Sequence, residues 1–102
     1  MKLVTIYWRD IPSQVLVQKG RTKAKVQLPQ RFQEAIDRAA MRAGKGSSDL
    51  YLEEWRRTTQ QVEPQEDLQG FAESTAEKLA DQFDDALLDR LIRNKGLRPE
   101  QD

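Results

Sequence analysis

The chain has 102 residues, the length of a single domain, and contains neither cysteine nor histidine. This excludes disulfides, thiolate nucleophiles and His–Cys zinc sites, so we expect no metal, no cofactor and no catalytic residues. The formal net charge is zero, but residues 1–57 carry a net charge of +6 and residues 58–102 a net charge of −6. We expect these two halves to pack together and to neutralise each other in part.

Nothing in the sequence predicts insertion into a membrane. No apolar run approaches the roughly 18 residues of a membrane-spanning helix. The first ten residues, MKLVTIYWRD, also lack the apolar segment and small-residue cleavage site of a signal peptide. We therefore expect a cytoplasmic protein with no membrane partner.

Three strands are predicted at the start of the chain. Residues 3–9 and 14–19 alternate apolar with polar side chains and are rich in β-branched residues. Residues 23–28 show the clearest alternation, with Ala24, Val26 and Leu28 on one face. A glycine at position 20 predicts a hairpin between the second and third strands. Together these patterns predict a three-stranded antiparallel meander with one solvated face.

Helices are predicted to follow the strands. Pro29 begins the first one, Gly44 ends it, and Phe32 and Ile36 lie on its apolar side. Trp8, Val26, Phe32 and Ile36 are expected to share one core.

A shorter second helix, capped by Ser48 or Asp49, would bury Tyr51, Leu52 and Trp55. Apolar residues at helical spacing then predict a helical segment that breaks near Asp84.

These elements predict one α+β domain over residues 1–96. Residues 1–57 would form the sheet and two helices, residues 58–67 a linker, and residues 68–96 the helical segment, with a frayed tail over 97–102. The architecture is thus a three-stranded antiparallel meander followed by two to four helices, with the first helix packed across the sheet.

One candidate binding surface combines aromatic and charged residues. Tyr7, Arg9 and Asp10 lie close together at the end of the first strand, and Tyr51 and Trp55 add exposed aromatic area. Such residues can hold a protein partner. The alternative is structural: Trp8 fills the core, Tyr7 covers the outer face, and Arg9 pairs locally with Asp10.

A second candidate is a basic stripe along the hairpin, formed by Lys19, Arg21, Lys23 and Lys25. Such a stripe can follow the phosphate backbone of a nucleic acid. The alternative is the solvated face of an edge strand, where lysines discourage aggregation.

Three stretches resemble a known family. They are residues 6–15, IYWRDIPSQV; residues 28–41, LPQRFQEAIDRAAM; and residues 49–55, DLYLEEW. They are similar to the small bacterial "virulence factor" domain family, in its stand-alone alphaproteobacterial form. The resemblance covers about residues 3–57 and implies no catalytic residues. It also implies an accessory role beside folate- and cobalamin-dependent methyl transfer.

We therefore expect a non-enzymatic accessory or protein-interaction module. The alternative is a nucleic-acid-binding module that uses the basic hairpin. Affinity that collapses with added salt would favour nucleic acid, whereas a protein that co-purifies at moderate salt would favour the first interpretation.

Overall fold

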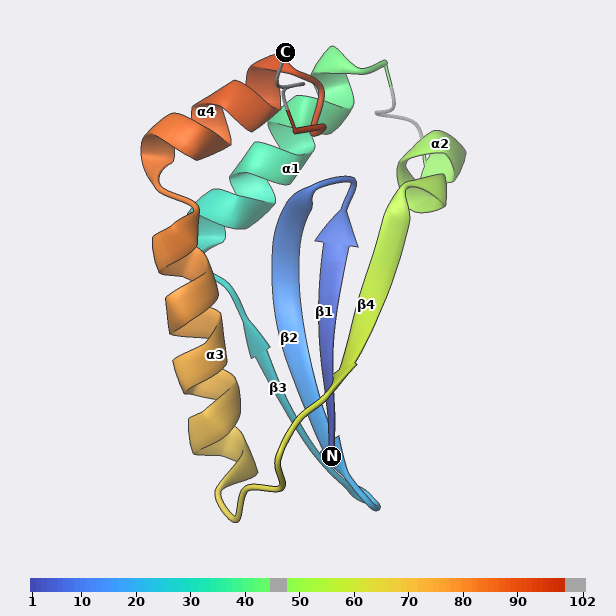
Figure 1. Cartoon of the computed structure of the whole chain (residues 1–102). Helices are drawn as coiled ribbons and strands as arrows, with labels where there is room; N and C mark the ends of the chain where they lie inside the picture. Colours follow the sequence, from blue (N-terminus) through green and yellow to red (C-terminus); the bar gives the residue numbers. More distant parts are fainter. Residues whose placement is uncertain (45–47, 99–102) are drawn as a thin grey trace.

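The computed structural model describes residues 1–44 and 48–98, which form a four-stranded antiparallel sheet and four helices (Figure 1). The α+β prediction is confirmed. The elements, in chain order, are β1 (Lys2–Trp8), β2 (Ile11–Lys19), β3 (Thr22–Gln27), α1 (Gln30–Arg42), α2 (Ser48–Glu53), β4 (Trp55–Gln61), α3 (Leu68–Gln82) and α4 (Asp85–Arg93). The strand order in the sheet is β3-β2-β1-β4, so the last strand lies beside the first.

The fourth strand corrects the sequence-based prediction. Trp55 was expected on a helix and residues 58–67 as a linker. Instead, β4 includes Trp55 and residues 58–61 and pairs with β1, with Thr58 opposite Thr5. Leu52, expected to be buried, is exposed. The sequence WRRTTQQ shows no apolar alternation because β4 is an edge strand whose side chains beyond Trp55 are all exposed.

Capping residues set the helix boundaries, largely as predicted. Pro29 precedes α1, and Gly44 follows it with a φ of +71°. The side chain of Asp84 accepts a hydrogen bond from the Leu87 amide, which ends the long helical segment and starts α4 at the predicted break. Asp67 caps α3 in the same way through the Gly70 amide. The predicted tail over 97–102 lies outside the described residues from position 99 onward.

One face of the sheet holds the core. Val15, Val17 and Ala24 are buried there, and α3 packs on β2 and β3 through a row of small residues, Ala72, Ala76 and Ala80. α1 packs on β2 and on α4. The first helix therefore contacts the sheet as predicted, but it shares the covered face with α3 (Figure 1).

The start of α1 is tied to the junction of α3 and α4. The guanidinium of Arg31 donates hydrogen bonds to the Phe83 carbonyl at 2.6 Å and the Ala80 carbonyl at 2.9 Å. It therefore adds hydrogen bonds to the carbonyls at the end of α3, where the Ala80 carbonyl also accepts from the Phe83 amide. The Phe32 ring meets Phe83 edge-on, and Arg31 forms an ion pair with Asp85 at 3.6 Å.

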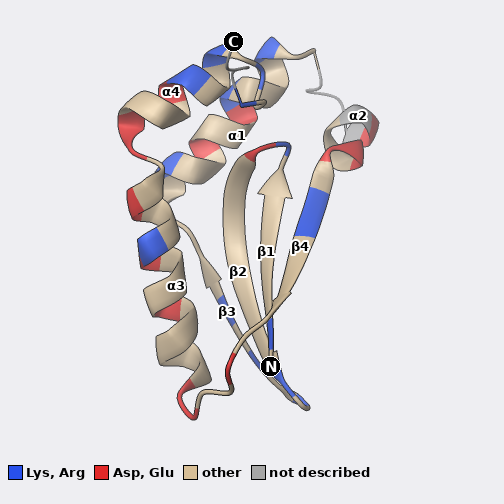
Figure 2. Ribbon diagram, viewed as in Figure 1, with Lys and Arg blue, Asp and Glu red and all other residues tan. Residues whose placement is uncertain are grey.

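The two charged halves pack together as predicted, but mainly through apolar side chains. Arg31–Asp85 joins the basic half to the acidic half, whereas Arg9–Glu54 and Asp10–Arg56 lie within the basic half. None of the four strands contains an aspartate or a glutamate, and the helices carry most of the acidic side chains (Figure 2). The basic side chains of the sheet are therefore left largely without acidic partners.

Truncation of Phe32 tests the core. Trp8, Phe32 and Ile36 are fully buried, as predicted, whereas Val26 is only partly buried. Phe32→Ala should lower the free energy of unfolding by about 3–5 kcal/mol because it opens a cavity beside Phe83. Met41→Ala, at an exposed position on the same helix, should change it by less than about 0.5 kcal/mol. Equal denaturant midpoints for the two variants would contradict this core.

Candidate functional site

The turn between β1 and β2 brings the predicted partner-binding residues together. Trp8, at the end of β1, is fully buried, and its indole N–H donates to the Tyr51 carbonyl at 2.9 Å. Tyr51 stacks on Trp8 with ring centroids 5.9 Å apart, and Trp55 meets Tyr51 edge-on at 5.6 Å. One aromatic cluster thus joins β1, α2 and β4.

Arg9 follows Trp8 in a left-handed conformation, with a φ of +52°. Its guanidinium donates to Glu54 Oε1 at 3.2 Å and to the Lys95 carbonyl at 2.9 Å, and it lies over the Trp8 ring. Only 12% of the side chain is exposed. These contacts hold a backbone conformation that non-glycine residues rarely adopt.

Asp10 holds two distant segments to the turn. One carboxylate oxygen accepts from the Arg56 guanidinium at 3.1 Å, and the other accepts from the Arg98 amide at 2.7 Å. The Asp10 amide donates to the Gly96 carbonyl. The predicted local pair between Arg9 and Asp10 is therefore wrong, because each residue pairs with a different strand or helix end.

The guanidinium of Arg56 lies over the ring of Tyr7, with the guanidinium carbon 4.4 Å from the ring centroid. All five predicted partner-binding residues thus lie around one turn, where their contacts stabilise the fold. Their role in binding a partner stays a prediction. Sequence reasoning missed Glu54 and Arg56 because their partners are more than 40 positions away.

The basic hairpin residues do not form one stripe. Lys19 donates to the Gln65 carbonyl at 3.3 Å, and Arg21 lies in the turn before β3. Lys23 and Lys25 stand opposite Gln18 and Leu16 across the β2–β3 ladder, which places them on the face of the sheet away from α3. The predicted nucleic-acid set is therefore divided between the two faces and the turn.

We call this second sheet surface the open face, because none of the described helices packs on it. Val4 is buried yet lies outside the core cluster, and Leu16, its partner across the β1–β2 ladder, does not pack against the core either. The alternation of the strands gives the face these residues: Lys2, Val4, Ile6, Gln14, Leu16, Gln18, Lys23, Lys25, Gln27, Arg57, Thr59 and Gln61. The next side chains on the same side, Trp8 and Trp55, belong to the aromatic cluster with Tyr51 and mark the end of the open face.

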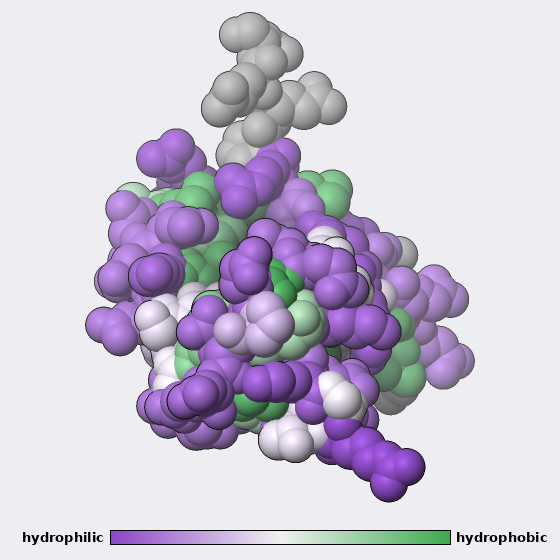
Figure 3. Space-filling model, turned by 60° about the horizontal axis from the view of Figure 1, so that its bottom comes forward, coloured by the Kyte–Doolittle hydropathy of each residue, from purple (hydrophilic) through white to green (hydrophobic). Residues whose placement is uncertain are grey.

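The open face therefore has an apolar centre and a rim of amides and cations, with no acidic side chain among its residues. Seen from the end of the molecule that lies at the bottom of Figure 1, the surface is mostly hydrophilic, with small apolar areas between polar side chains (Figure 3). An apolar centre with a polar rim is the usual composition of a protein interface.

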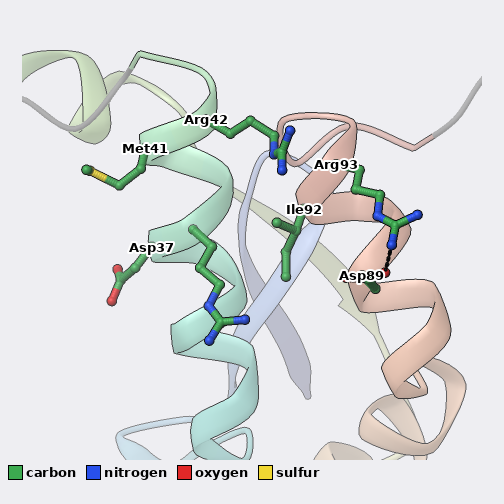
Figure 4. A pocket seen from close by; sticks show the side chains of 7 residues that line it. Asp37, Met41, Arg42, Asp89, Ile92 and Arg93 are labelled. Carbon is green, nitrogen blue, oxygen red and sulfur yellow. Dashed lines mark ion pairs between the residues drawn. The ribbon is translucent and has the colours of Figure 1, made fainter.

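A shallow groove of about 740 Å³ lies between α1 and α4 on another part of the surface (Figure 4). Ile92 lies between the two helices and Arg42 extends toward α4, whereas Met41 and Asp37 point away from it. Asp89 and Arg93 form an ion pair at 2.9 Å along the α4 side. The lining of the groove is mainly apolar, but its charged residues are of both signs, so it shows less preference for a charged partner than the open face.

Comparison with protein families gives a match over most of the chain. The family is described as "Virulence factor", and the match spans residues 6–92. The chain belongs to the Virulence factor family. The match extends beyond the residues that carried the resemblance and includes β4, α3 and most of α4. No curated protein and no solved structure matches the chain.

This Virulence factor domain was compared with the requirements of a metal site and of a membrane-spanning helix. Within residues 1–44 and 48–98, no three acidic side chains lie close enough together to hold a metal ion. In the same part of the chain, no helix is both long and apolar enough to cross a membrane. The expectation that the domain binds no metal stays a prediction.

A pair of glycine variants tests the cluster at the turn. A Cβ at Gly96 would lie 2.8 Å from the buried Trp8 ring, whereas one at Gly20 would meet nothing within 4 Å. Both glycines have positive φ, so alanine at either site should cost about 1–2 kcal/mol of backbone strain. Gly96→Ala should cost roughly 1–3 kcal/mol more, because the packed indole cannot move aside. Thermal melting of the two variants measures the difference, and equal losses would contradict close packing at Trp8.

Proposed function

We propose that this domain is a non-enzymatic accessory module that binds the acidic surface of a protein partner through its open face. One observation carries the proposal: the side of the sheet around Val4, Ile6 and Leu16 lies outside the core, and no strand of that sheet contains an acidic residue. Lys23, Lys25 and Arg57 stand on this face, and none has an ion-pair partner among the described residues. A partner's carboxylates would supply the missing opposite charge.

The centre of the face supports a protein rather than a small anion as the ligand. Val4, Leu16 and Ile6 are neighbours on β1 and β2, and the half-buried Leu16 and Ile6 offer apolar area that a partner can remove from water. The surrounding glutamines and Thr59 can form hydrogen bonds at the rim. Affinity would then come from the centre, while the cations would orient the partner and accelerate its association.

Residue chemistry supports a module that catalyses no reaction. A chain without histidine or cysteine lacks the commonest acid–base and nucleophilic side chains. The same proposal places the module in the cytoplasm, because the absence of cysteine suits a reducing compartment. The family resemblance supports an accessory role beside folate- and cobalamin-dependent methyl transfer.

Nucleic acid is the second candidate ligand, because a cationic face without acidic residues also suits a phosphate backbone. Against it, the aromatic residues on this side of the sheet, Trp8 and Trp55, pack against Tyr51, and Trp8 is fully buried, which leaves little aromatic surface on which a base could stack. The observations therefore favour the protein partner.

Charge reversal on the open face tests the proposal. The double variant Lys23→Glu/Lys25→Glu should weaken binding of a partner captured from the native cell by roughly 2- to 10-fold, because two favourable contacts become repulsive. Lys78→Glu, at an exposed site on α3, is the matched control and should leave that affinity unchanged. Isothermal titration calorimetry with the purified partner measures both.

A fluorescent single-stranded oligonucleotide separates the two candidates. Binding that disappears with added salt and with the double variant would favour nucleic acid instead. Equal partner affinities for the double variant and for Lys78→Glu would contradict the proposal for the open face.

A further inference from the structure

β4 forms one edge of the sheet, and its backbone hydrogen bonds show which of its amides are unpaired. Met1 and Val62 exchange two hydrogen bonds, each of 3.0 Å, and the Arg9 amide donates to the Glu54 carbonyl at the other end of the strand. In an antiparallel pair such bonds recur at every second residue. The even-numbered residues of β4 therefore bond to β1, and the odd-numbered residues direct their N–H and C=O groups away from the sheet.

The outward-directed residues are Trp55, Arg57, Thr59 and Gln61. None of the described elements lies along this edge (Figure 1). The strand also contains no proline, and its register with β1 runs without a break. Prolines and bulges are devices that usually prevent an edge from pairing with another strand, and β4 has neither.

We propose that β4 pairs antiparallel with β4 of a second copy of this chain, about a two-fold axis at Thr58. In this register Arg57 stands opposite Thr59 of the other copy, and Trp55 stands opposite Gln61. Each of these pairs joins two residues whose amides point outward, so each can exchange two hydrogen bonds. Thr58 stands opposite Thr58 of the second copy, and no two like charges stand directly opposite each other.

The other edge of the sheet is less suited to an equivalent pairing. A β3–β3 pair centred at Ala24 would place Lys23 opposite Lys25, and one centred at Lys25 would place that lysine opposite itself. Like charges directly opposite each other destabilise a strand pair. The lysines therefore protect β3, whereas the arginines of β4 meet only threonine and glutamine in the register centred at Thr58.

This pairing is isologous and closed, because each copy contributes the same edge. It joins two four-stranded sheets into one of eight strands. Since the axis runs perpendicular to the sheet, the two open faces lie on the same side. The dimer would then present one continuous basic surface of twice the area.

Two substitutions at one exposed residue test the register. Thr59 of each copy faces Arg57 of the other, so Thr59→Glu adds two attractive pairs and Thr59→Lys adds two repulsive ones. Thr59→Glu should tighten the dimer and Thr59→Lys should weaken it, each by roughly 2- to 30-fold in the dissociation constant. Sedimentation equilibrium over a range of protein concentrations measures the dissociation constant of the dimer for the unaltered protein and for both variants. Melting curves establish that each variant is folded.

Amide hydrogen exchange provides a second measurement on the unaltered chain. The amides of Arg57 and Thr59 should become protected as concentration rises, whereas those of Arg56 and Thr58 bond to β1 and should be protected throughout. The proposal would be overturned if the protein remained monomeric and the amides of Arg57 and Thr59 exchanged equally fast at all concentrations. A dimer whose dissociation constant is the same in both Thr59 variants would also overturn it, because the copies would then associate through another surface.

Discussion

Burial of the Trp8 indole is the constraint on which the rest of the structure depends. Trp8 is the last residue of β1. Its indole donates the N–H to the Tyr51 carbonyl and packs closely against Gly96, which follows α4. Three segments distant in sequence therefore meet at one side chain. Arg9 and Asp10, the next two residues, add hydrogen bonds to the same segments. The conspicuous motif at this turn is thus explained first as the joint that holds the helices and β4 to the central hairpin.

The distribution of charge follows from the layered architecture. The sheet contains only neutral and basic residues, while the four helices together carry most of the acidic side chains. An apolar core separates the two layers, and the ion pair Arg31–Asp85 joins α1 to α4 and does not involve the sheet. A chain with zero net charge can therefore present a strongly basic face. Net charge alone is a poor guide to what such a domain binds.

β4 has a part in both of the surfaces that we propose for recognition. Its odd-numbered residues contribute side chains to the open face through Arg57, Thr59 and Gln61, and the same residues direct their amides to the free edge. Pairing along the edge would leave the side chains on the face accessible, because the two directions are perpendicular in a strand. The same residues can therefore serve self-association and partner binding together.

The sequence by itself determined the elements whose signals are local. Alternation at Val15 and Val17 located a central strand, and caps such as Asp84 located the helix ends, because each signal acts within a few residues. Sequence reasoning also selected the residues of the turn, although it assigned them to binding and did not find their partners. Only the tertiary structure decided that polar residues 55–61 form a strand, since β4 exists through its pairing with β1, as between Thr58 and Thr5. The same pairing decided which side chains face outward and which amides remain unpaired, because both depend on contacts between residues far apart in the chain.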